Sequence, residues 1–123
     1  MPSSEVSSRL EALQPEIAGE LNTISAMAPE ATDPELLSLC AGYVEAALRC
    51  QDWSPPERGL SDREQAFIDF TEQFVTSVST MSDEQVSRLL EFADADQVYG
   101  FVHALYVTDM SLRLDIVGRE VLV

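Results

Sequence analysis

The chain contains no lysine, and all 7 of its basic residues are arginines. Without a lysine amine, Schiff-base chemistry on a protein side chain is excluded. The 22 acidic residues give a formal net charge of −15. Binding to nucleic acid or to an anionic membrane surface depends on basic side chains, so neither partner is expected. The acidic residues are spread along the chain, which is typical of a solvated, highly charged surface.

Histidine and cysteine are almost as scarce. One histidine cannot build a multi-histidine metal site, and 2 cysteines do not make a disulfide framework. There is also no glycine-rich phosphate-binding loop, so we expect neither a metal nor a cofactor. No apolar run approaches the roughly 20 residues that span a bilayer. The N-terminus lacks the positive and apolar regions of a signal peptide, and we expect a cytoplasmic protein.

What the chain does contain is an apolar fraction of 46% over 123 residues, enough for the core of one domain. The apolar residues recur at steps of three and four, and no segment alternates for long enough to be a strand. The sequence therefore predicts an all-α protein of five or six helices. We expect a single domain over residues 1–123, with an N-terminal helical segment at 1–32 and a core at 33–123.

Proline marks the boundaries in the first half of the chain. We expect Pro15 to end one helix and open a second, with both pieces facing the same core because the apolar phase continues across it. Residues 29–34 are predicted to be a connector. Asp33 as N-cap and Pro34 at the first helical position start the next helix, which runs toward Cys50. The proline-rich run Trp53–Gly59 is predicted to be a loop.

Capping signals mark the second half. Capping boxes at Ser61–Glu64 and Ser82–Gln85 open two helices, and Asp94 starts a last, long one that we expect to stop at Gly118. That last helix has little polar face, which places it in the centre of the fold or at a subunit interface. The apolar tail Val121–Val123 would be exposed unless something covers it. The apolar first helix would also be left partly uncovered, and these two uncovered segments favour a homo-oligomer.

Two stretches of the chain carry a family resemblance. In Leu60–Glu72 a Leu-Ser pair precedes a glutamate and an alanine-containing helix, and Met81–Leu114 reads as a closing helix pair with an arginine near its end. With Pro34–Leu37, these stretches extend over most of residues 33–120. They resemble the carboxymuconolactone decarboxylase family, which includes the alkylhydroperoxidase AhpD-like proteins. The resemblance implies a compact AhpD-like helical fold and assembly as a homo-oligomer.

The redox members of that family carry a glutamate, then two cysteines spaced C-x-x-C, then a histidine. With Glu35 in the glutamate position, the cysteine positions fall on Ala47 and Cys50. The histidine position falls on Ser54, so only Glu35 and Cys50 match. The resemblance therefore implies a degenerate member without the dithiol and its proton shuttle, in which peroxidase or disulfide-reductase activity is not expected.

The spacing of the two cysteines agrees with this. Cys40 and Cys50 lie ten residues apart on one predicted helix, hence about 15 Å along its axis. A disulfide needs Cα atoms within about 7 Å, so the two cannot pair. We interpret Cys40 as a small core residue. Cys50 lies beside Arg49, which would lower the pKa of its thiol, but no resolving thiol is near.

His103 is the only side chain whose ordinary pKa lies near neutrality. It would act as acid or base with Tyr99, Tyr106 or Arg113, the arginine holding a substrate carboxylate. The plainer interpretation is a helix histidine satisfied by a neighbouring group. Arg113 likewise follows Asp109 by four residues, a spacing that forms an ion pair within a helix.

Two functions from different classes follow. The first is a carboxymuconolactone decarboxylase-like protein without dithiol chemistry that serves as a non-catalytic binding or assembly subunit. The alternative is a non-redox decarboxylase or isomerase that acts on a small carboxylated substrate. In that enzyme the catalytic candidates are His103, Arg113, Glu35 and Cys50. The expected partners are a second copy of the chain, another protein or a small carboxylated ligand.

Overall fold

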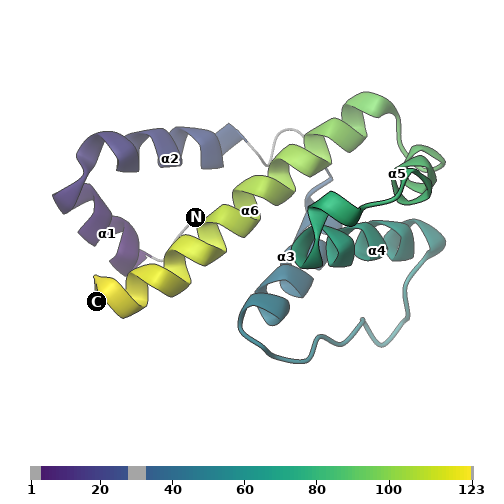
Figure 1. The fold of residues 1–123 in the computed structure, drawn as a ribbon, viewed down its shortest axis with the longest axis horizontal. Helices are drawn as coiled ribbons and strands as arrows, with labels where there is room; N and C mark the ends of the chain where they lie inside the picture. The colour runs from purple at the N-terminus through teal and green to yellow at the C-terminus, as the bar shows by residue number, and fades with distance from the viewer. Residues whose placement is uncertain (1–3, 28–32, 123) are drawn as a thin grey trace.

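The structure is a computed structural model that describes residues 4–27 and 33–122. Every regular element within these ranges is helical, as the sequence predicts (Figure 1). In chain order they are α1 (Ser4–Leu13), α2 (Pro15–Met27), α3 (Pro34–Leu48), α4 (Asp62–Thr76), the short 3-10 helix η2 (Val78–Thr80), α5 (Asp83–Leu90) and α6 (Ala95–Val121). None of the helices in the described ranges is long and apolar enough to cross a membrane.

The predicted helix starts are confirmed by their hydrogen bonds. The Asp33 side chain accepts from the backbone N–H groups of Glu35 and Leu36 at the start of α3. Capping boxes open α4, α5 and α6 at Ser61, Ser82 and Asp94, with Glu64, Gln85 and Gln97 as the reciprocal partners. Each box satisfies two backbone N–H groups that the helix leaves without an internal partner. The connector predicted at residues 29–34 lies outside the described residues except for Asp33 and Pro34.

The main core lies between α3, α4, α5 and the N-terminal half of α6, which we call the body. Its centre is an edge-to-face aromatic contact between Phe67 of α4 and Phe101 of α6, whose ring centroids are 4.7 Å apart. Cys40 and Val44 of α3 are fully buried against it. The predicted core role of Cys40 is therefore confirmed.

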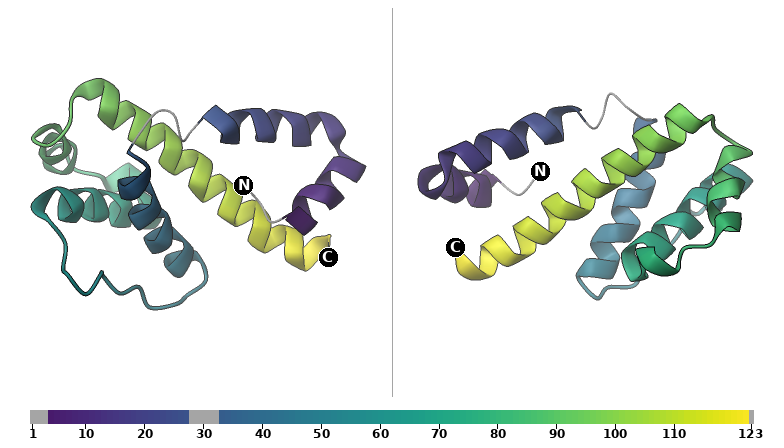
Figure 2. Two further views of the ribbon diagram at one scale, coloured as in Figure 1. Left: turned by 180° about the vertical axis from the view of Figure 1, so that it is seen from behind. Right: turned by 45° about the horizontal axis from the view of Figure 1, so that its top comes forward.

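The helices α1 and α2 form a pair, here called the arm, that packs on α6 and stands away from the body (Figures 1 and 2). Both pieces contact α6, as the expectation of a shared core requires, but the predicted apolar stripe is not buried along its whole length. Leu13 and Ile17 remain 62% and 48% exposed, and only Val6 and Ala18 of the described arm side chains are buried. Because the chain turns between Leu13 and Pro15, an apolar stripe that is continuous in sequence is not continuous in space.

Gly118 does not stop α6, which continues to Val121. The residue is instead a point of close approach between α1 and α6. A Cβ atom built on Gly118 would lie 2.5 Å from Cγ1 of Val6, closer than van der Waals contact allows. The glycine is therefore explained by the packing of the arm, and a stop signal was the wrong interpretation.

Replacing Gly118 by alanine is expected to weaken the docking of α1 on α6 by about 1–2 kcal/mol. The added methyl overpacks the contact, and this destabilises more than the higher helix propensity of alanine stabilises. Gly19→Ala is the matched control, since a Cβ there meets nothing within 4 Å. Hydrogen exchange should show faster exchange of the α1 amides in Gly118→Ala and unchanged or slower exchange in Gly19→Ala. Equal protection of α1 in both variants would contradict this account of the glycine.

Candidate functional site

The structure places three of the four predicted catalytic candidates on α3 and α6 and Cys50 in the turn that follows α3, and all four are exposed. Glu35 and Cys50 lie at opposite ends of α3. His103 and Arg113 lie on α6 ten residues apart, which is about 15 Å along the helix axis. The four residues therefore do not converge on one point, and their catalytic roles stay predictions.

Arg113 is engaged by the ion pair that its spacing predicts. Its Nε donates to Oδ2 of Asp109 at 2.9 Å and to Oδ1 at 3.1 Å. The Arg113 side chain is 54% exposed, so this pair contributes well under 1 kcal/mol to stability. A substrate carboxylate bound by Arg113 would compete with Asp109.

Cys50 closes the C-terminus of α3. The helix ends at Leu48, and Cys50 has a φ of 55°, in the left-handed region. Its N–H donates to the carbonyl of Ala47, and the N–H of Gln51 donates to that of Ala46. These two bonds form a Schellman motif, in which the left-handed position is usually glycine. Both cysteines are free thiols, so the prediction that they do not pair is confirmed.

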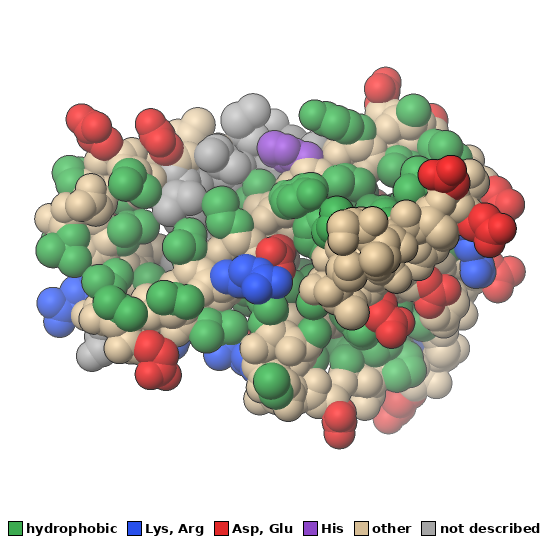
Figure 3. Space-filling model, viewed as in Figure 1, with side chains coloured by type: hydrophobic (Ala, Val, Ile, Leu, Met, Phe, Trp, Pro, Cys, Tyr) green, Lys and Arg blue, Asp and Glu red, His purple; other side chains and the backbone are tan. Residues whose placement is uncertain are grey.

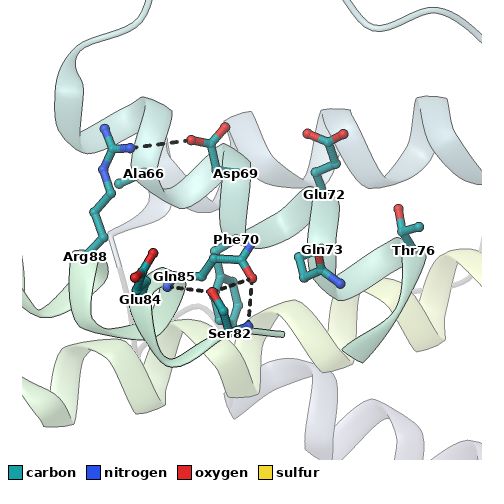
Figure 4. Close-up of a pocket in the computed structure, with 10 residues that line it drawn as sticks. All are labelled: Ala66, Asp69, Phe70, Glu72, Gln73, Thr76, Ser82, Glu84, Gln85 and Arg88. Carbon is teal, nitrogen blue, oxygen red and sulfur yellow. Dashed lines mark hydrogen bonds and ion pairs between the residues drawn. The ribbon is translucent and has the colours of Figure 1, made fainter. Parts of the chain in front are cut away.

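The largest of the described grooves lies between α4 and α5 (Figure 4). It has a volume of about 490 Å³ and a polar lining to which α4 and α5 both contribute. Much of that lining is already paired. Arg88 lies 3.8 Å from the carboxylate of Asp69, and Ser82 and Gln85 bond to each other as the cap of α5. None of the four candidates lines this groove, and the Arg88–Asp69 ion pair joins α5 to α4 across it.

Metal binding has no support among the described residues. They contain no group of three or more His, Cys, Asp or Glu side chains placed to hold an ion. The nearest approach to a charged cluster joins α3 to the end of α6, where Asp115 accepts from Arg49 at 3.3 Å and from Arg119 at 3.4 Å. Two arginines around one buried carboxylate make this an ion-pair network that fixes α3 against α6.

The most distinctive surface is one face of α6, here called the α6 stripe. It consists of Tyr99, His103, Tyr106, Met110, Arg113, Val117 and Val121, spaced four, three, four, three, four and four residues apart. This spacing keeps all seven on one side of the helix over about 33 Å. Four of them are large apolar side chains that remain exposed: Tyr99 at 77%, Tyr106 at 52%, Val117 at 58% and Val121 at 73%.

The opposite side of α6 explains why this face is open. Phe101, Leu105 and Ser111 point into the packed interior and are buried. Tyr106 lies at the boundary, where its ring contacts that of Phe74 edge-to-face at 4.7 Å. α6 therefore uses one face for its own core and leaves a second, largely apolar face only partly covered by the described residues, by Phe74 at Tyr106 and by α1 beside Val117 and Val121.

An apolar groove adjoins the C-terminal end of the stripe, between α1 and α6. Its volume is about 190 Å³, and its lining is almost entirely apolar: Val6, Leu10, Leu114, Val117, Gly118, Val121 and Leu122. Val117 and Val121 belong to both the stripe and the groove. The groove lies beside the point where Gly118 and Val6 come close.

Figure 3 shows hydrophobic side chains over the arm and the C-terminal half of α6, with carboxylates mostly around the edge of the molecule. The sequence predicts part of this surface, because the scarcity of polar residues in the last helix indicates a central or interface position. It did not reveal the groove, since Val6 and Leu10 are more than 100 residues from the residues they meet. Only the fold of the arm brings them there.

No family model matches the chain, and neither a curated protein nor a solved structure matches it.

Proposed function

We propose that the chain is a non-catalytic binding or assembly subunit that associates with further copies of itself. In this proposal it is a degenerate carboxymuconolactone decarboxylase-like protein without dithiol chemistry. The observation that carries the proposal is the α6 stripe. A row of exposed large apolar side chains along one face of a helix is typical of an interaction site. The stripe itself contains no carboxylate, although the chain carries a net charge of −15.

The total surface supports association. A compact monomer of 13.6 kDa is expected to expose about 6,600 Å². The chain exposes 7622 Å², which is about 1,000 Å² more. A standard protein interface covers about 800 Å² on each partner. The excess fits an open arrangement, in which the arm stands away from the body (Figure 1), and it is similar in size to one such interface.

The alternative function, a decarboxylase or isomerase acting on a small carboxylated substrate, gains no support from the geometry. Such an enzyme would need His103 and Arg113 beside a common pocket that excludes water. Both side chains are exposed, Arg113 is paired with Asp109, and neither lines the grooves described above.

The proposal places the protein in the cytoplasm. Cys50 is an exposed thiol without a disulfide partner, and free thiols persist in a reducing compartment.

Native mass spectrometry combined with light scattering tests the proposal. We expect a homo-oligomer without bound small molecule, and tighter association as the salt concentration rises from about 50 to 300 mM. The reason is that each chain carries −15, so added salt screens the repulsion between copies while the apolar contact persists. A monomer at every concentration and salt would contradict the proposal. A retained small organic acid would favour the enzyme instead.

A further inference from the structure

We infer that two copies of the chain pack their α6 stripes antiparallel about a two-fold axis at Met110, with Tyr99 of each copy inserted into the α1–α6 groove of the other. The inference rests on the proposed self-association and adds its orientation and its anchor. It starts from two features that a single chain leaves unmatched: an aromatic side chain that is 77% exposed and an apolar groove open to solvent.

The groove suits one aromatic ring. Its volume is about 190 Å³ and its lining is apolar, and an apolar cavity of about 150 Å³ in another protein binds benzene. Aromatic side chains that fill apolar pockets are the usual anchors of protein interfaces. The open mouth of the groove leaves the phenol hydroxyl at the rim, where water can satisfy it.

The positions along α6 bring anchor and groove together. Tyr99 lies eleven residues before Met110, and Val121 lies eleven residues after it. When two copies of a helix run antiparallel and cross at Met110, Tyr99 of one copy therefore faces Val121 of the other. Val121 is one wall of the groove. The two-fold axis makes the contact twice, since each copy supplies one tyrosine and one groove.

The charges on the stripe favour this orientation over a parallel one. In the antiparallel register Arg113, which pairs with Asp109 of its own chain, also lies beside Tyr106 and Asp109 of the other copy, where the guanidinium meets a ring face and a second carboxylate. A parallel pair would place each Arg113 beside its own counterpart and would stack Tyr99 on Tyr99. Like charges that face each other across an interface are unfavourable. The large tyrosines lie toward the N-terminal end of the stripe and the smaller valines at its C-terminal end. The two sets meet and interdigitate only when the helices run in opposite directions.

Disulfide trapping tests the orientation. In a Cys50→Ser background the buried Cys40 is the remaining native thiol. Met110→Cys is expected to cross-link to itself, because the two-fold axis passes through it. Tyr99→Cys and Val121→Cys are expected not to cross-link when each is oxidised alone, but to form a mixed dimer when the two variants are combined.

The role of Tyr99 as the anchor is tested by measuring the dimer affinity of single variants in the otherwise wild-type chain. Tyr99→Ala is expected to weaken dimerisation by at least about 100-fold, because two copies of the anchor are lost at once. Tyr99→Phe should retain the affinity. Leu90→Ala is the matched control, an apolar side chain of α5 that is 49% exposed and outside the stripe, and it should leave the dimer unchanged. Tyr99 is too exposed for its removal to unfold the chain.

The other outcomes separate this inference from the proposed function. Self-cross-linking of Tyr99→Cys and of Val121→Cys would show a parallel pair and overturn the inference. An oligomer by mass with no cross-link at any of the three positions, or with equal affinity in Tyr99→Ala and Leu90→Ala, would also overturn it and leave the proposed assembly role standing. A monomeric wild-type protein would overturn both.

Discussion

Replacing Phe67 by alanine is expected to lower the free energy of unfolding by about 3–5 kcal/mol, the range found when a buried phenylalanine is truncated. Phe67 is only 2% exposed and stands at the centre of the body. Its ring contacts that of Phe101 edge-to-face, and the Arg63 guanidinium carbon lies 5.8 Å from its centroid. Truncation removes both contacts and leaves a cavity between α4 and α6, which the rigid helices cannot close.

The loss is large for a domain of this size, whose total stability is typically about 5–15 kcal/mol. It should appear as a fall of about 10–20 °C in Tm and as an earlier midpoint in urea at unchanged slope. Phe92→Ala is the matched control, because the same atoms are removed from a side chain that is 36% exposed. We expect it to cost less than about 1 kcal/mol. Equal losses in the two variants would contradict the position of the core between α4 and α6.

Local chemistry made the boundaries of the helices predictable. Pro15, Asp33, Ser61 and Ser82 act through hydrogen bonds and backbone limits that extend over only three or four residues. A single sequence contains all of that information. The all-α class was predictable for the same reason, since helical spacing of apolar residues is also a local property.

The features that depend on contacts between distant segments were not predictable. Gly118 looks like a helix stop in the sequence, and only the approach of Val6 explains why it lies within α6. The periodicity of α1 and α2 indicates an apolar face but cannot say which surface that face meets. The same limit applies to His103, because its spacing placed it on a helix and left open whether that side of the helix is covered.

The exposed stripe and the buried core of α6 together explain its unusual composition. A surface helix of a monomer needs one apolar face. α6 has one for the body, around Phe101 and Leu105, and a second that begins at Tyr99. A helix that must satisfy two partners has few positions left for charged residues, and most of the negative charge of the chain accordingly lies on other elements.

Burial of Cys40 is expected to make the stability of the fold depend on pH in the alkaline range. Burial raises the pKa of this thiol from 9.0 to about 11, and the nearby charge of Glu64 acts in the same direction, while a hydrogen bond with Thr71 opposes them. At pH 7 the thiol is protonated in both the folded and the unfolded chain. Between pH 9 and 11 the unfolded chain releases the proton and the folded chain keeps it, so the free energy of unfolding falls as pH rises.

The fall amounts to about 2–3 kcal/mol by pH 11, since each pKa unit corresponds to about 1.4 kcal/mol. It is measured as the difference between the wild type and Cys40→Ala in urea unfolding at pH 7, 9, 10 and 11. Other groups that titrate in this range, Tyr43 among them, are the same in both proteins and cancel in the difference. Cys40→Ala should be less stable than the wild type at pH 7 and should lose less free energy of unfolding between pH 7 and 11. Parallel curves for the two proteins would show that the thiol is not held in its neutral form by the core.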